Sequence, residues 1–83
     1  MRTADVGQRC HCVIREIFAA NLRKCRLRQG LSQEELAHRA KIDRTYVSAL
    51  ERGVHAASID VVDRLAVALN SQAWELLRPE DST

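Results

Sequence analysis

The chain contains very few aromatic residues and little glycine or proline. Its 83 residues include one phenylalanine, one tyrosine and one tryptophan, with three glycines and one proline. Apolar residues still make up 46% of the chain, so its core is expected to be aliphatic. Runs of aromatic and β-branched residues, which are typical of strands, are almost absent. We therefore predict an all-α fold.

Long apolar runs are missing as well. No segment approaches the roughly 20 apolar residues of a membrane-spanning helix, and the N-terminus has no apolar stretch like that of a signal peptide. We expect a soluble, cytoplasmic protein with no membrane partner. The length suits one domain over residues 1–83, with a modest core that dimerisation would help to stabilise.

The residue groupings that enzymes use are not found in the sequence. There is no Ser/His/Asp grouping, no glycine-rich phosphate loop and no complete set of metal ligands. Cys10, His11 and Cys12, with Cys25 or His38, come nearest to a metal or redox site. However, Cys10 and Cys25 fall on an apolar helix face, and the Cys-x-Cys spacing lacks a second ligand pair. We therefore expect reduced thiols, no enzyme activity, no metal, no cofactor and no small-molecule ligand.

The first predicted helix follows a polar N-terminus. Residues 1–9 are expected to be loosely ordered. From Cys10 to Cys25 apolar residues recur every three or four positions, which predicts one apolar helix face. This helix is expected to end near Gln29, before Gly30.

Two further helices are predicted in the C-terminal part. Ser58 is the expected N-cap of a helix that stops near Asn70, with Ile59 among the residues of its inner face. A short helix over residues 73–77 follows. Residues 78–83 form a polar tail that begins around a proline.

Residues 31–53, LSQEELAHRAKIDRTYVSALERG, carry the most informative pattern of the chain. Ser32 is a natural N-cap. Glu35 stands three residues later, so the two residues predict a capping box at the start of a helix that runs to about Ala40.

A second short helix follows after a tight turn. Asp43 is its expected N-cap and Gly53 its C-terminal glycine, so the helix is predicted over residues 44–52. Val47 and Leu50 face inward at about 100° per residue. Two short helices with such a turn between them indicate a helix-turn-helix, and the second is the expected recognition helix.

The outward face of this second helix carries hydrogen-bonding side chains of sizes suited to DNA. Arg44 and Thr45, just inside the N-cap, are our candidates for reading base edges, and an arginine can contact guanine through two hydrogen bonds. Ser48 is short enough to reach a base or a phosphate. Ala49, at the edge of the face, offers a methyl group for thymine. Arg52 is placed for a phosphate contact at the end of this face.

The motif S-Q-E-E-L-A, a hydrophobic turn residue, and then Y-V-S-A-L-E-R-G resembles the Cro and phage-repressor (XRE) helix-turn-helix family. The resemblance covers roughly residues 18–77, and DRTYVSALERG is most similar to the controller proteins of restriction-modification systems. It implies a compact five-helix bundle, the lambda-repressor-like DNA-binding domain. It also implies a homodimeric transcription regulator that binds double-stranded DNA at a palindromic operator, with half-sites about 34 to 36 Å apart.

The resemblance also implies roles for individual residues around the recognition helix. Gln33 would hold a DNA phosphate at the start of its helix, where the helix dipole favours an anion, and would brace the recognition helix. His55 stands where controllers carry a basic side chain near the DNA backbone. Tyr46 is interpreted either as a phosphate donor or as a residue at the edge of the core.

Other family features concern the fold. Arg26 and Glu51 match positions that often form a structural ion pair between the first and third helices. Lys41 and Asn70 replace commonly found glycines, and the turn at Lys41 is expected to need a left-handed backbone.

The C-terminal part is the predicted dimer interface. Residues 1–52 hold eleven Lys/Arg and six Asp/Glu, and residues 53–83 hold two and five, so the basic half is expected to face DNA. Trp74, with Leu77, is the expected interface anchor because its predicted helix is too short to bury so large a side chain. The alternative is that Trp74 covers the core of its own chain.

A second class of function stays open from the sequence. The same fold can serve as a protein-interaction or antitoxin-like module whose surface binds mainly a protein. The tails are short for a segment that wraps a toxin, which argues against this alternative.

Overall fold

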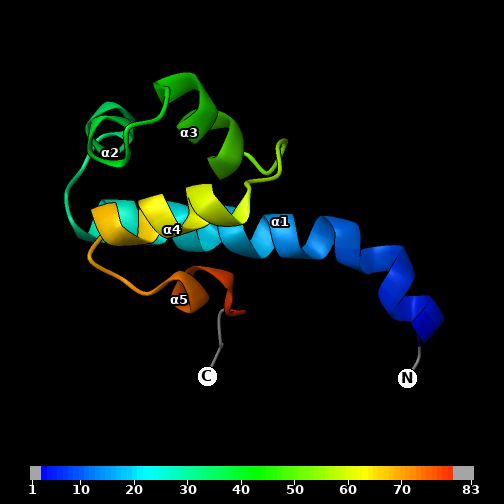
Figure 1. Cartoon of the computed structure of the whole chain (residues 1–83). Helices are drawn as coiled ribbons and strands as arrows, with labels where there is room; N and C mark the ends of the chain where they lie inside the picture. The colour runs from blue at the N-terminus through cyan, green and yellow to red at the C-terminus, as the bar shows by residue number, and fades with distance from the viewer. Residues whose placement is uncertain (1–2, 80–83) are drawn as a thin grey trace.

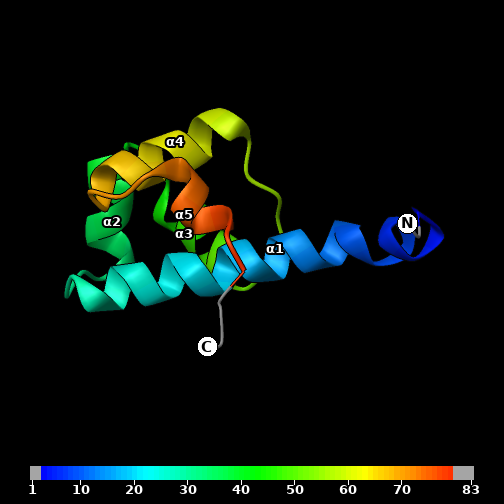
Figure 2. The same ribbon diagram turned by 90° about the horizontal axis from the view of Figure 1, so that it is seen from below.

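Helix α1 runs along the length of the molecule, and the other four helices gather beside its C-terminal part, beyond which its N-terminal part extends (Figures 1 and 2). The computed structural model describes residues 3–79, with side chains described from residue 13 onward. The helices are α1 (Thr3–Arg28), α2 (Gln33–Ala40), α3 (Arg44–Glu51), α4 (Ile59–Ala68) and α5 (Ala73–Leu77). Helix α1 packs on α3 and α5, and α4 packs on α2 and α5. The described part contains no strand, and the predicted all-α class is confirmed.

Three helix starts are capped as the sequence predicts. Ser32 Oγ accepts a hydrogen bond from Glu35 N–H at 3.0 Å, and Ser32 N–H donates to Glu35 Oε1 at 2.9 Å. Asp43 Oδ2 accepts from Thr45 N–H at 3.0 Å, and Ser58 Oγ accepts from Val61 N–H at 3.1 Å. Each cap satisfies a backbone donor that has no partner within its helix.

Helices α1 to α4 end in the same left-handed turn. The residues with positive φ are Gly30 (70°), Lys41 (62°), Gly53 (73°) and Asn70 (59°). After each of them, a backbone N–H donates to a carbonyl five residues back; one such bond joins Ile42 N–H to Ala37 O at 3.0 Å. The predicted left-handed backbone at Lys41 is confirmed. It costs a residue with a Cβ about 1 kcal/mol.

Two sequence expectations about helix residues are corrected. Helix α1 begins at Thr3 rather than Cys10, because no proline interrupts the chain before the apolar periodic segment. Ile59 is not on the inner face of α4, since it is 85% exposed. At about 100° per residue, Ile59 lies at the flank of the arc that contains Val62 and Leu65, so its first-turn side chain stays uncovered.

The core is aliphatic, as predicted from the composition. Its fully buried side chains come from all five helices: Leu22, Leu36, Val47, Leu50, Leu65, Leu69 and Leu76. Phe18 adds the one aromatic ring that is buried in the described part. Because α3 contributes Val47 and Leu50 to this core, its opposite face must point outward.

Candidate nucleic-acid interface

The outward face of α3 consists of Arg44, Thr45, Ser48 and Arg52 at its C-cap. Arg44, Thr45 and Arg52 are exposed, and Ser48 is half-buried. Among the side chains of residues 13–79, neither Arg44 nor Arg52 forms an ion pair. Both guanidinium groups are therefore available to an external acceptor. The structure thus brings together four of the five side chains predicted for this face.

Ala49 does not belong to this outward face. It is only 5% exposed, whereas the sequence predicted a methyl group available to a thymine. The loop after α3 turns back at this point, and Val54 N–H donates to Ala49 O at 3.2 Å. A buried methyl group cannot contact a base edge. The prediction that Ala49 reads a base is therefore wrong for this geometry.

Tyr46 lies at the edge of the core. Its half-buried ring packs against the core cluster, and its hydroxyl donates to Ala56 O at 3.3 Å. A phenol has one hydrogen to donate, so a phosphate would have to replace this carbonyl. The geometry therefore supports the core-edge interpretation. The exposed His55 lies beside this ring, with 6.4 Å between the two ring centroids.

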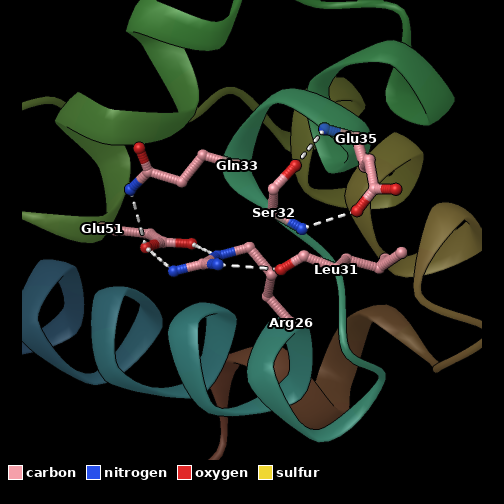
Figure 3. Close-up of polar contacts among 6 residues, drawn as sticks. All are labelled: Arg26, Leu31, Ser32, Gln33, Glu35 and Glu51. Carbon is pink, nitrogen blue, oxygen red and sulfur yellow. Dashed lines mark hydrogen bonds and ion pairs between the residues drawn. The ribbon is translucent and has the colours of Figure 1, made fainter.

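A buried carboxylate ties α3 to two other helices (Figure 3). Glu51 Oε2 accepts from Arg26 Nε at 2.6 Å, and Glu51 Oε1 accepts from Arg26 Nη2 at 3.0 Å. The side chains of Arg26 and Glu51 are 11% and 4% exposed. The structure therefore contains the predicted ion pair, in the two-hydrogen-bond geometry that makes arginine a strong carboxylate partner.

Two hydrogen bonds extend this ion pair, and one of them gives Gln33 the role that the family resemblance implied, which is to brace the recognition helix. Gln33 Nε2 donates to Glu51 Oε1 at 3.0 Å, and Arg26 Nη1 donates to Leu31 O at 2.9 Å. Side chains from α1 and α2 thus hold the end of α3 (Figure 3). Gln33 keeps a second amide hydrogen and its carbonyl oxygen, so a phosphate contact by the same side chain stays a prediction.

Asn21 is another buried residue that the sequence analysis missed. Its Nδ2 donates to Leu76 O at 2.9 Å and to Arg78 O at 2.7 Å. The signal was present, because this amide occupies a position of the apolar face of α1, next to Leu22. It fixes the end of α5 against α1 and so determines where the side chains of α5 point.

Helix α5 directs its tryptophan outward. Trp74 is 56% exposed and Leu77 is 39% exposed, while Leu76 between them is fully buried. The guanidinium carbon of Arg78 lies 5.7 Å from the centre of the Trp74 ring. The alternative interpretation, in which Trp74 covers the core of its own chain, is wrong because Leu76 occupies that place.

The structure offers no metal-binding group among the residues that it describes. Cys25 is half-buried and packs against the core, as expected for a thiol on an apolar helix face. The side chains of Cys10, His11 and Cys12 lie outside the described residues. None of the helices from residue 3 to residue 79 combines the length and apolarity needed to cross a membrane.

Comparison with known proteins links this geometry to a family. The helix-turn-helix family model matches residues 22–73. A hypothetical transcription factor from Neisseria meningitidis is 42% identical over 66 residues, which are 80% of this chain and 62% of that protein. The chain therefore spans less than two thirds of that relative. Control protein C.SmaI from Serratia marcescens is 38% identical over 77 residues, covering 93% of this chain and 88% of that protein.

Solved structures agree with these matches. The crystal structure of the restriction-modification controller protein C.AhdI from Aeromonas hydrophila has a TM-score of 0.73 at 40% identity, covering 75% of this chain and 94% of that chain. The matched segment includes the capped pair α2 and α3, together with α4, which packs on α2. The chain therefore belongs to the XRE-type helix-turn-helix family of DNA-binding transcriptional regulators.

Proposed function

We propose that this chain is a homodimeric, sequence-specific regulator that inserts α3 into the major groove of a palindromic operator. Arg44, Thr45 and Ser48 would contact base edges. Gln33 and Arg52 would contact phosphates on either side of the groove, and His55 would lie near the DNA backbone when α3 is docked. No catalytic step, metal or cofactor is part of this proposal.

One observation carries the proposal most directly. The exposed face of α3 presents two unpaired arginines, one at each end of the helix, while the C-terminal end is held by the buried side chain of Glu51. A reading helix must keep a fixed angle to place its side chains on chosen bases, and the contacts of Glu51 with Arg26 and Gln33 restrict that angle. The rigid attachment and the free outward face together favour sequence-specific binding over general attraction to DNA.

We further propose that the regulated genes are those of a restriction-modification system. The similarity to C.SmaI and C.AhdI, whose names mark them as controllers, supports this assignment.

Selection of bound duplexes from a random library tests the DNA-binding proposal. We expect the recovered sequences to share a palindrome whose half-sites are centred about 34 to 36 Å apart, one helical turn. In a gel-shift assay, a protein that stays bound to the palindromic duplex in the presence of scrambled competitor DNA would support the proposal. Recovery of no preferred duplex would contradict it and favour the protein-interaction module.

Replacing Arg52 with alanine is expected to weaken binding to cognate and scrambled duplexes by similar factors. A phosphate contact contributes affinity but little sequence information. The slope of log Kd against log salt should fall by about 0.9 per subunit. The matched control is Arg64→Ala, which removes the same charge from the exposed side of α4. A changed base preference would refute the phosphate role of Arg52.

Gln33→Ala should also weaken binding to both duplexes, but without the change in salt slope, because the amide is neutral. It additionally removes the hydrogen bond to Glu51. We therefore expect a small loss of stability, about 0.5 to 1.5 kcal/mol, in urea unfolding.

Trp74→Ala is expected to shift the protein toward monomer and to reduce operator affinity. Trp74 and Leu77 form exposed apolar surface on α5, and a large ring that immobilises few torsions is typical of an interface anchor. Sedimentation at micromolar concentration measures the dimer fraction. Leu27→Ala, which truncates another exposed apolar side chain on α1, is the control and should leave it unchanged. A fully dimeric Trp74→Ala protein would exclude this interface.

A further inference from the structure

Lys41 is poorly suited to the backbone conformation that it adopts. Of the four left-handed residues that end α1 to α4, two are glycines and one is an asparagine. Glycine meets no steric penalty there, and the short asparagine side chain tolerates it. Lysine has neither advantage. Glycine would be more stable at this position, and backbone strain of this kind is typical of residues that have a functional role.

The position of Lys41 places its side chain near the DNA-reading residues proposed for α3. It lies in the turn between α2 and α3, three residues before Arg44, and its side chain is exposed. Consecutive Cα atoms are 3.8 Å apart, so the Cα atoms of Lys41 and Arg44 are separated by at most about 11 Å. The major groove is about 12 Å wide. With Arg44 on a base, the Lys41 ammonium group on its four-carbon stem is within reach of a phosphate bordering the groove.

No group within the described part of the protein neutralises this ammonium. Among residues 13–79, Lys41 forms no side-chain ion pair or hydrogen bond. The nearest carboxylate in sequence, Asp43, already accepts a hydrogen bond from Thr45 N–H and caps α3. The positive charge of Lys41 is therefore exposed to solvent, in the turn that leads into α3 and its outward face.

We propose that Lys41 is a DNA-phosphate ligand, held in the turn between α2 and α3 at the expense of folding stability. This inference rests on the proposed function, since it requires α3 to dock on DNA. It assigns the chain one phosphate contact per subunit in addition to Gln33 and Arg52. It also explains why a lysine occupies a turn that favours glycine.

Three substitutions at this position separate charge from backbone strain. Lys41→Gln removes the charge and keeps a long side chain in the left-handed turn. Lys41→Gly removes the charge and relieves the turn, and Lys41→Arg keeps the charge. Asn70→Gly is the control for the backbone effect, because it relieves the same conformation at the end of α4.

Two properties of each variant are measured. The first is the melting temperature without DNA, at one fixed protein concentration. The second is the salt dependence of binding to a selected duplex and to a scrambled duplex. We expect Lys41→Gln and Lys41→Gly to lower affinity for both duplexes and to reduce the salt slope by about 0.9 per subunit. Lys41→Arg should keep the wild-type slope. Lys41→Gly should melt about 4 to 8 °C higher. Asn70→Gly should keep the wild-type slope.

A wild-type salt slope in Lys41→Gln on both duplexes would overturn the phosphate contact, whatever the stability of Lys41→Gly. That result would leave the proposed function intact, because the wild-type chain would still bind its duplex. Failure of the wild-type chain to bind any duplex would overturn both proposals.

Discussion

Replacing Glu51 with alanine is expected to lower the free energy of unfolding by about 3 to 5 kcal/mol. The Glu51 carboxylate is 4% exposed and accepts hydrogen bonds from Arg26 and Gln33. Without it, the nearly buried guanidinium group of Arg26 has no counter-charge. Domains of this kind are typically stable by only 5 to about 15 kcal/mol, so the variant should unfold at a much lower urea concentration. Circular dichroism during urea titration measures the change.

Glu34→Ala is the matched control, because it removes an exposed carboxylate from the first turn of α2. It should change stability by no more than about 0.5 kcal/mol. The double variant Arg26→Ala with Glu51→Ala should lose less than the two single losses combined, since neither charge is then left alone. A loss below about 1 kcal/mol for Glu51→Ala, which is typical of an exposed pair, would contradict the structural role assigned to this network.

Arg44→Ala is expected to make DNA binding less selective. If Arg44 contacts a guanine through two hydrogen bonds, its loss should cost about 1 to 3 kcal/mol per contact, or about 5- to 150-fold in affinity for the cognate half-site. Binding to scrambled DNA should change much less. Repeating the duplex selection with the variant would show relaxed preference at one base pair in each half-site.

Arg39→Ala provides the comparison for this experiment. Arg39 is an exposed arginine on α2, outside the outward face of α3, so its removal changes the net charge by the same amount. We expect Arg39→Ala to retain the wild-type base preference. Equal losses on cognate and scrambled duplexes with Arg44→Ala would instead identify Arg44 as a phosphate contact.

Local features of the sequence were sufficient to predict the helix-turn-helix. Ser32, Asp43 and Ser58 cap their helices as expected, and Val47 and Leu50 turn inward as their spacing indicates. These signals are readable because caps and helical periodicity involve residues only a few positions apart. The family resemblance added the pair Arg26 and Glu51, which no local pattern alone would have connected across 25 residues.

The burial of individual site residues was decided by the tertiary structure. Ala49 was expected at the edge of the DNA face, but its side chain is buried. Ile59 was expected in the core, but no neighbour reaches it. The sequence by itself determined which residues form helices and which stripe of α3 is polar, because those properties repeat along the chain. Only the tertiary structure decided that Glu51 is the residue through which Gln33 braces α3, that the Tyr46 hydroxyl donates to Ala56 in the next loop, and which of the two alternatives for Trp74 applies. Each of these depends on which distant segment packs beside the residue.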